Sequence, residues 1–425
     1  TRVERLHAMM QRPRLLVVVL AWSAAACSPL ASAVLPGASM QPVRIRPADP
    51  RPPIERDPVA AAWTVAIDRI VGGQPVSVAV GIGRRLVYQH LGDRSRLPAS
   101  NQKLVLSMAA LDTFGPSHRF VTMARPSHPL RLGVLRGDLW LIGSGDPELT
   151  PAGLSVLADS LHDRGLRTVS GSVVGDVAAF DRRWWAPGWI RGLSRHYVAR
   201  PTALSLNGNA GLTRPELAAA AALTDALRSS GVTVEGSPRA GRRPAHLQPP
   251  LALVRSAPLA DILLRQNHGS INFDAEMLTE ALGARVSGSQ GSTRGGAAAM
   301  ESWASHEGVR LRAFDGSGLS HRDRVSTVDL VTLLLDARRE AWGHTLITSL
   351  PSGGEGTLGA RLAGVPVHAK TGTLFVTPVS ALSGYVRTSE GRLVAFSVLS
   401  RGLSKSAAVA IEDAVVRTIA GARLR

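Results

Sequence analysis

Residues 97–106 read Leu-Pro-Ala-Ser-Asn-Gln-Lys-Leu-Val-Leu, and the apolar run continues to Leu111. Proline favours the first turn of a helix, so this pattern predicts a helix that starts near Ala99. Ser100 and Lys103 stand three residues apart, which puts both side chains on one face of that helix. A serine hydroxyl is a weak nucleophile until a neighbouring base takes its proton, and this spacing holds an amine within its reach.

An ordinary lysine cannot act as that base, because a pKa of about 10.4 makes its deprotonation at pH 7 cost about 4.6 kcal/mol. Burial, the positive end of a helix and a second cation would each lower that pKa. Of the 49 Lys and Arg residues only three are lysines, Lys103, Lys370 and Lys405. Arginine keeps its proton and lysine can lose it, so the positions that stay lysine are candidates for chemistry. A lone Ser-x-x-Lys is weak evidence, and a solvated helix residue is the alternative for Lys103.

The composition bounds the class of protein. A length of 425 residues suggests about two to three domains, and 44% hydrophobic residues suffice for a core. The formal charge is +17, but the arginines are scattered and seldom interleaved with aromatic residues. This disfavours nucleic acid and favours an anionic cell-envelope surface. The single cysteine excludes a disulfide framework and a cysteine-based zinc site, and we expect no metal and no cofactor.

Residues 1–33 are typical of a signal peptide with an upstream extension. Two arginines precede an apolar run at 15–26, which is too short to span a bilayer. The Ala-Ser-Ala at 31–33 fits ordinary cleavage, which we favour, whereas the Ala-Ala-Ala-Cys at 24–27 resembles a lipoprotein site that would use Cys27 as a lipid anchor. Both readings predict a protein secreted to the periplasm or cell wall, peripheral to a membrane at most.

The rest of the chain divides by its pattern. Residues 34–59 are rich in proline and predict an extended linker. A catalytic domain is expected in two parts, 60–130 and 246–425, with an inserted α/β domain at 131–245. We expect strands at 75–80, 85–90, 169–174, 367–374, 379–386 and 393–399, and a strand that ends in a glycine-rich turn at 137–147. Further helices are expected at 153–165, 215–228, 255–264, 273–282, 327–340 and 407–420.

Two more segments carry polar side chains of interest. Ser270 and Asn272 stand two apart in a polar turn and can aim at one point, although helix capping is the alternative. Residues 367–374 read Val-His-Ala-Lys-Thr-Gly-Thr-Leu, a strand that carries Lys370. Gly372 has no Cβ, so a ligand or another backbone can approach that strand closely.

Ser-x-x-Lys, Ser-x-Asn and Lys-Thr-Gly in this order form the signature of the penicillin-recognising serine enzymes. The surrounding residues resemble the DacB-type D-alanyl-D-alanine carboxypeptidases/endopeptidases, the low-molecular-mass class C penicillin-binding proteins. This resemblance covers about residues 60–422. The segments that carry it are 97–103, 141–147 (Leu-Ile-Gly-Ser-Gly-Asp-Pro), 203–207 (Ala-Leu-Ser-Leu-Asn), 315–320 (Asp-Gly-Ser-Gly-Leu-Ser) and 369–374 (Ala-Lys-Thr-Gly-Thr-Leu).

The resemblance implies an α/β (α+β) fold of the penicillin-binding-protein/β-lactamase type, with an antiparallel sheet flanked by helices and one inserted domain. It also implies a serine-type D-Ala-D-Ala carboxypeptidase that acts on peptidoglycan stem peptides through an acyl-enzyme, with β-lactam antibiotics as covalent inhibitors. An additional DD-endopeptidase activity stays open. Ser100 would be the nucleophile and Lys103 its general base, Ser270 would relay a proton toward the leaving D-alanine, and Asn272 would hold the substrate amide.

The same resemblance implies a set of substrate-binding residues. Lys370 would bind the substrate carboxylate and lower the pKa of the general base by like charge, and Thr371 would help to hold that carboxylate. Gly372 separates these two from Thr373, whose backbone N–H resembles an oxyanion-hole donor together with that of the nucleophile. Asp176 matches a position that in some relatives faces the stem-peptide amine.

Two departures and two alternatives accompany this reading. Ile271 stands where the family often has aspartate, and Ser270 follows Ser100 by only 170 residues, which leaves room for one inserted domain. A β-lactamase or esterase would share the fold, but the chain has neither a Glu-x-x-Leu-Asn loop nor a Tyr-x-Asn. A catalytically silent cell-envelope binding protein would lack the chemistry, and the intact Ser100 and Lys103 argue against it.

Overall fold

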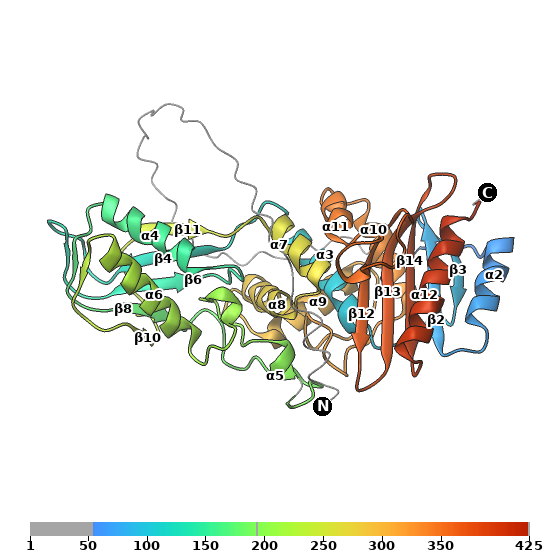
Figure 1. Ribbon diagram of the computed structural model, residues 1–425, viewed down its shortest axis with the longest axis horizontal. Helices are drawn as coiled ribbons and strands as arrows, with labels where there is room; N and C mark the ends of the chain where they lie inside the picture. The colour runs from blue at the N-terminus through green and yellow to red at the C-terminus, as the bar shows by residue number, and fades with distance from the viewer. Residues whose placement is uncertain (1–53, 193, 424–425) are drawn as a thin grey trace, which may run out of the picture. The chain divides into compact units, whose positions relative to one another are not determined.

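The computed structural model describes residues 54–192 and 194–423 (Figure 1). The predicted signal peptide, its two processing sites with Cys27, and most of the predicted linker lie outside the described residues. Within the described part of the chain, no helix is both long and apolar enough to cross a membrane.

The larger sheet contains β1 (Glu55–Arg56), β2 (Val76–Ile82), β3 (Arg85–His90), β12 (Val367–Leu374), β13 (Val379–Arg387) and β14 (Leu393–Arg401). Their order across the sheet is β1-β3-β2-β14-β13-β12. Neighbouring strands are antiparallel, except that β1, at the expected end of the linker, runs parallel to β3. The strands predicted at 75–80 and 85–90 and the predicted antiparallel sheet are therefore confirmed, and β12 is an edge strand.

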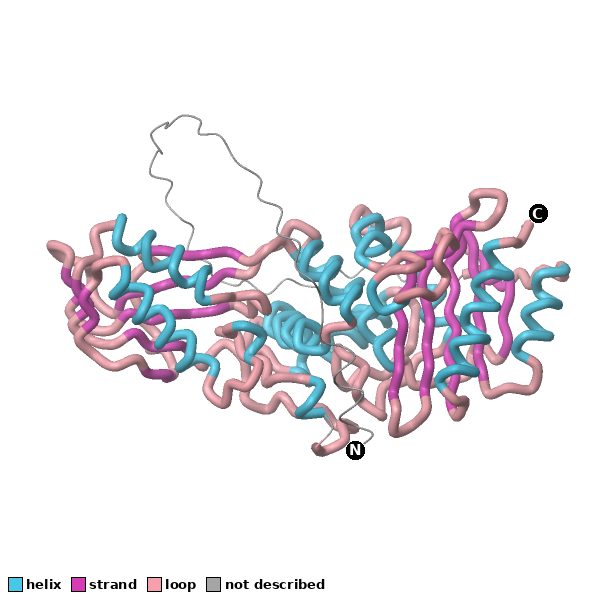
Figure 2. Tube along the Cα trace, in the orientation of Figure 1, coloured by secondary structure: helices cyan, strands magenta, loops and turns pink. Residues whose placement is uncertain are grey.

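Helices cover both faces of this sheet (Figure 2). One face shares an apolar core with α2 (Ala62–Val71) and α12 (Lys405–Ala420). The other face packs against α3 (Gln102–Phe114) and α10 (Thr327–Ala337) in a larger core. Strand β2 reads Val-Ser-Val-Ala-Val-Gly-Ile and is buried along its whole length, because apolar layers lie on both of its faces.

A second sheet contains β4 (Val121–Pro126), β6 (Leu139–Gly143), β8 (Val173–Asp176), β10 (Arg239–Gly241) and β11 (Ala252–Arg255), in the order β10-β8-β6-β4-β11. It shares a core with α4 (Pro151–Asp163) and α6 (Pro215–Ser229). Helix α4 starts where the sequence favours it, with Thr150 Oγ1 accepting from Gly153 N at 3.2 Å and proline in the first turn. Strands β4 and β11 lie beyond the range 131–245 predicted for the insert.

The prediction of one strand at 169–174 was wrong, because this segment forms parts of two strands that belong to different sheets. A small three-stranded sheet contains β5 (Val134–Leu135), β7 (Thr168–Val169) and β9 (Thr233–Val234), whereas β8 belongs to the five-stranded sheet. Between β7 and β8, Gly171 N donates to Gly137 O at 3.0 Å, and a Cβ on Gly171 would lie 2.6 Å from that oxygen. Glycine thus lets the chain cross closely from one sheet to the other.

Two helical predictions also need correction. The helix expected at 255–264 is α7 (Leu259–Gly269), which begins after Pro258, so Asn267 and His268 are helical and not in a turn. The helix expected at 327–340 ends at Ala337. The remaining short helices are α5 (Ser194–Tyr197), α11 (Gly343–Ser349), η1 (Ala99–Asn101), η2 (Asn207–Asn209) and η3 (Gly356–Leu358).

Helix α9 (Thr293–His306) was not predicted, because Gly295 and Gly296 have low helix propensity. The reason for glycine is packing against α8 (Asn272–Ser287). A Cβ on Gly296 would lie 1.9 Å from Thr279 O, so only glycine allows this close approach. Tertiary contact overrides local propensity here.

Candidate active site

Ser100 lies in η1, the short 3₁₀ helix that leads directly into α3. Its neighbour Ala99 has a φ of 47°, which is unusual for a residue with a Cβ and marks local strain. Asn101 Nδ2 donates to Lys370 O at 2.8 Å, which fastens this turn to β12. Ser100 lines a cavity of about 420 Å³. The strained turn therefore presents a hydroxyl to a cavity large enough for a small ligand.

The Lys103 amine is fully buried behind Ser100. Its Nζ lies 3.2 Å from Ser100 Oγ, 2.8 Å from Asn272 Oδ1 and 2.7 Å from Ser317 O. Ser317 O is a backbone carbonyl and can only accept. Asn272 Nδ2 donates to Tyr197 O at 3.3 Å, which directs Oδ1 toward the lysine. A neutral amine has two N–H donors and one lone pair, so two fixed acceptors use both donors and turn the lone pair toward Ser100.

Burial lowers the pKa of Lys103 to about 8, although the carboxyl groups of Asp315, Glu276 and Asp274 favour its charged form. Burial and the neighbouring Lys103 also lower the pKa of Lys370 well below its ordinary value. Burial is the larger cause for both amines, and the charge effect is resolved only on Lys370, so a lowering of the Lys103 pKa by Lys370 stays a prediction. This pair favours the loss of a proton from one lysine.

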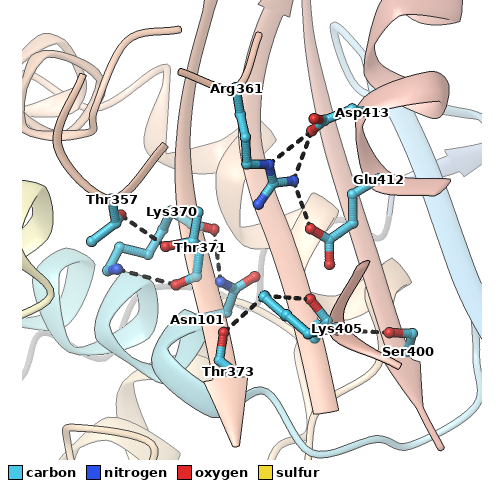
Figure 3. A network of polar contacts seen from close by, with 11 residues as sticks. Asn101, Thr357, Arg361, Lys370, Thr371, Thr373, Ser400, Lys405, Glu412 and Asp413 are labelled. Carbon is cyan, nitrogen blue, oxygen red and sulfur yellow. Dashed lines mark hydrogen bonds and ion pairs between the residues drawn. The ribbon is translucent and has the colours of Figure 1, made fainter. Parts of the chain in front are cut away.

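Strand β12 passes directly beside the nucleophile. A Cβ on Gly372 would lie 3.0 Å from Pro98 O and 3.1 Å from Ser100 N. The missing side chain therefore permits the close backbone approach that the sequence predicted. Lys370, on the same strand, is fully buried, and its Nζ donates to Thr371 O at 3.1 Å (Figure 3).

Two threonine hydroxyls flank Gly372, and both line the cavity. Thr371 Oγ1 donates to Thr357 Oγ1 at 2.8 Å. Thr373 Oγ1 accepts from Lys405 Nζ at 2.8 Å, as Figure 3 shows. Strand β12 thus presents hydroxyl groups on either side of the glycine.

Ser270 and Asn272 reach the same cavity from the junction of two helices. Ser270 is the C-cap of α7 and has a left-handed conformation, with a φ of 52°. Ile271 follows in an extended conformation, and α8 begins at Asn272. The kink between α7 and α8 therefore brings both polar side chains to the wall that faces β12.

A profile of the D-Ala-D-Ala carboxypeptidase 3 (S13) family matches residues 78–220 and 210–421. The chain belongs to this family. A D-alanyl-D-alanine carboxypeptidase of Actinomadura sp. (strain R39) is 31% identical, over 84% of this chain and 82% of that protein. The carboxypeptidase DacB of Mycolicibacterium smegmatis (strain ATCC 700084 / mc(2)155) is 29% identical, over 74% of this chain and 73% of that protein.

The fold of this S13 member is also that of a solved penicillin-binding protein. The crystal structure of penicillin binding protein 4 (dacB) from Haemophilus influenzae superposes with a TM-score of 0.74 at 21% identity, covering 85% of this chain and all of that one. A second structure of that protein, complexed with a β-lactam, superposes with a TM-score of 0.68 at 21% identity, over 83% of this chain and 98% of that one. The predicted family and fold class are therefore confirmed.

The S13 chain places Asp176 differently from the other predicted site residues. It lies at the end of β8, is buried, and is not among the residues that line the cavity. Its carboxylate accepts from Ala178 N at 3.0 Å and Arg243 N at 3.1 Å, and it pairs with the Arg243 guanidinium. A contact between Asp176 and a substrate stays a prediction.

The sequence marked the loop at residues 315–320 only as part of the family resemblance, and its role in supporting Lys103 was missed. Ser317 donates its N–H to Glu276 Oε1 at 2.8 Å, and Glu276 lies one helical turn after Asn272 on α8. Asp315, at the start of that loop, accepts from Gly318 N at 2.7 Å and from the Trp189 indole at 2.5 Å. Asn272 and Glu276 lie four residues apart on one face of α8, so the sequence could have indicated that Glu276 belongs to the site. The contact between Trp189 and Asp315 joins distant parts of the chain, and no sequence pattern indicates it.

Within residues 54–192 and 194–423, no cluster of three or more His, Cys, Asp or Glu side chains is placed to hold a metal ion. The polar side chains that line the cavity carry hydroxyl, amide, amine, imidazole and guanidinium groups. This set suits acyl transfer by nucleophilic attack.

Proposed function

We propose that this member of the S13 family is a serine-type D-Ala-D-Ala carboxypeptidase, which removes the terminal D-alanine of peptidoglycan stem peptides through an acyl-enzyme on Ser100. One observation carries the proposal: the buried Lys103 Nζ lies 3.2 Å from Ser100 Oγ and also contacts two fixed acceptors, Asn272 Oδ1 at 2.8 Å and Ser317 O at 2.7 Å. The Actinomadura relative is named for the same activity.

In the acylation step, the Lys103 lone pair takes the Ser100 proton as Oγ attacks the carbonyl carbon of the penultimate D-alanine. The backbone N–H groups of Ser100 and Thr373 hold the resulting oxyanion, a contribution of roughly 3 kcal/mol per donor. The C–N bond then breaks and an ester forms on Ser100. The departing amine takes the proton from Lys103, with Ser270 as the relay between them.

The terminal carboxylate of the substrate decides which lysine keeps the proton. We place this carboxylate at the end of the cavity that Thr371 and Thr373 of β12 line, with Lys370 fully buried behind the lining residues. An anion there favours the charged form of Lys370, and that charge in turn favours the neutral form of Lys103. Substrate binding thus prepares the base, and a water molecule activated by Lys103 later hydrolyses the ester.

A β-lactam offers a comparable carbonyl and carboxylate, so it should acylate Ser100 and leave it slowly. The test is the intact mass of the protein after incubation with benzylpenicillin, followed by peptide mapping, with Ser100→Ala as the matched control. A long-lived adduct on Ser100 together with release of D-alanine from a stem pentapeptide is the expected result. Rapid turnover of penicillin would indicate a β-lactamase, and the absence of any adduct would indicate a silent binding protein; either would overturn the proposal.

The peptide bond that cross-links two stem peptides also ends at a D-residue, so the same chemistry applies to an endopeptidase activity. Mass spectrometry of the products from purified peptidoglycan separates the two reactions, since only cleavage of cross-links converts dimers to monomers. We place the enzyme outside the cytoplasm, secreted or held by a lipid on Cys27, because its substrate is the cell wall.

A further inference from the structure

The third lysine of the chain, Lys405, belongs to the same cavity as Ser100. It is the first residue of α12, and its side chain reaches across the edge of the larger sheet (Figure 3). Its Nζ donates to Thr373 Oγ1 and to Ser380 Oγ, each at 2.8 Å. All three lysines, in a chain that otherwise uses arginine, therefore serve one site.

The position of Lys405 is a poor one for a cation. The N-terminus of a helix carries partial positive charge, so a lysine in the first turn of α12 is disfavoured there. Capping does not require it, because the helix is capped by Ser404, whose Oγ accepts from Ala407 N at 3.2 Å. A role outside the helix is the better explanation for a lysine at this position.

The hydrogen bonds of Lys405 fix the direction of a neighbouring proton. Lys405 is exposed, and although desolvation lowers its pKa, Glu412 and Asp413 favour its charged form, which can only donate. Thr373 and Ser380, which face each other across β12 and β13, must both accept from it. The Ser380 hydroxyl also favours the charged form of the Glu412 carboxylate on α12.

The hydrogen of Thr373 is left free to point into the cavity that this residue lines. Thr371 differs, since its hydroxyl donates to Thr357. The two carboxylates nearest on α12, Glu412 and Asp413, are each held by Arg361 at 2.7 Å, which leaves Lys405 to the hydroxyl pair. A hydroxyl that accepts from an ammonium group is a stronger donor to an anion, because each bond polarises the next.

We propose that Lys405 is a positioning residue, which makes the Thr373 hydroxyl a donor to the terminal carboxylate of the substrate and so sets the preference for peptides with a free C-terminus. This inference rests on the proposed carboxypeptidase function. It adds a residue outside the three sequence motifs. It also assigns the discrimination between a carboxylate and a neutral end group to Thr373, the β12 hydroxyl that contacts Lys405.

The test compares N-acyl-D-Ala-D-Ala with its C-terminal amide and measures kcat/KM for each. Lys405→Met should lower the acid-to-amide ratio about tenfold or more, because a hydrogen bond to a charged group is lost. Rates for the amide should change less than about threefold, since that substrate has no carboxylate to hold. Arg417→Met, an exposed charge at the other end of α12, is the matched control and should leave the ratio unchanged.

A double-mutant cycle separates positioning from long-range charge. With Thr373→Val, the Lys405→Met change should lower the ratio by less than about threefold, because its partner is gone. An unchanged ratio in Lys405→Met alone, or an equal loss in both backgrounds, would overturn the inference. Lys405→Ala takes the place of Lys405→Met if thermal unfolding shows that the latter does not fold. Failure of the wild-type protein to cleave the acid substrate or to form a Ser100 adduct would instead overturn the proposed function.

Discussion

Two regions of this protein each place a lysine beside a hydroxyl at one cavity, and they differ in access to water. Behind Ser100, Lys103 is fully buried and lies 3.2 Å from Ser100 Oγ. Beyond Thr373, Lys405 is exposed and lies 2.8 Å from Thr373 Oγ1. The contacts are chemically alike, since in both an amine nitrogen meets a serine or threonine oxygen.

Burial decides which way the proton moves in each pair. The buried Lys103 has a pKa lowered to about 8, so its amine can take the proton of Ser100. Desolvation also lowers the pKa of the more exposed Lys405, but Glu412 and Asp413 favour its charged form, and an ammonium group can only donate to Thr373. Glycine at position 372 lies between the two regions and lets β12 touch the Ser100 turn. Residue type alone does not distinguish the general base from the hydrogen-bond donor, since both are lysines. The difference lies in how far each lysine is exposed to solvent.

Replacing each of these two lysines by arginine should distinguish their roles most clearly. Lys103→Arg should slow acylation of Ser100 by about 10³-fold or more, because arginine cannot release its proton. Lys405→Arg should slow it less than about tenfold, since a charged donor remains. Stopped-flow acylation by a fluorescent penicillin measures both variants. Equal losses in the two would show that neither lysine acts as a base.

Removing the close approach of β12 should have the next largest effect. Gly372→Ala places a Cβ 3.0 Å from Pro98 O and 3.1 Å from Ser100 N, so the strand or the turn must shift. We expect about a 10²-fold lower acylation rate, as small misplacements of reacting groups commonly cost that much. Gly73→Ala, where a Cβ meets nothing within 4 Å, is the control and should acylate normally. A normal rate for Gly372→Ala would mean that contact between β12 and Ser100 is not needed.

Lys370→Arg compares the roles of the two buried lysines, Lys370 and Lys103. A carboxylate anchor needs only charge, so this variant should lose about tenfold in acylation, mostly because a larger side chain must fit a fully buried site. The loss should appear in KM for a peptide that carries a C-terminal carboxylate, with kcat changed less. A loss as large as that of Lys103→Arg would indicate that Lys370, and not Lys103, is the base.

The smallest effect on chemistry is expected in the five-stranded sheet. Asp176→Asn breaks the ion pair with Arg243 and should lower the free energy of unfolding by about 1–3 kcal/mol. Acylation should stay within about twofold, because Asp176 does not line the cavity. Asp138→Asn, which removes the partner of Arg239 in the same sheet, is the matched control. A tenfold or greater loss with a stem peptide for Asp176→Asn alone would support the substrate contact that the family resemblance implied.

The sequence predicted the groups that local spacing brings together. Ser100 and Lys103 share a helical face, and Lys370 and Gly372 share a strand, so short-range geometry was enough for them. The family resemblance supplied Asn272, and the structure places its Oδ1 2.8 Å from the Lys103 amine. These positions follow from period and motif, which a single chain displays.

The remaining parts of the site depend on contacts that no local pattern records. Ser317 contributes a backbone carbonyl, which every residue has, so its sequence carries no mark of the role. Trp189 contacts Asp315 across 126 positions of the chain, a distance that no local pattern spans. Lys405 lies 32 residues from Thr373 and follows no motif, although its rarity as a lysine was a signal. Tertiary folding alone brings these groups to the cavity.

The pH dependence of the second-order rate constant for Ser100 acylation tests the central claim most directly, because it reports the free enzyme. Only the neutral form of Lys103 can accept the proton, and lowering the pH protonates it. The rate should therefore rise about tenfold per pH unit at low pH and level off above a midpoint near pH 8. A rate that is constant between pH 6 and 9, or that falls as the pH rises through this range, would contradict a role for Lys103 as the general base.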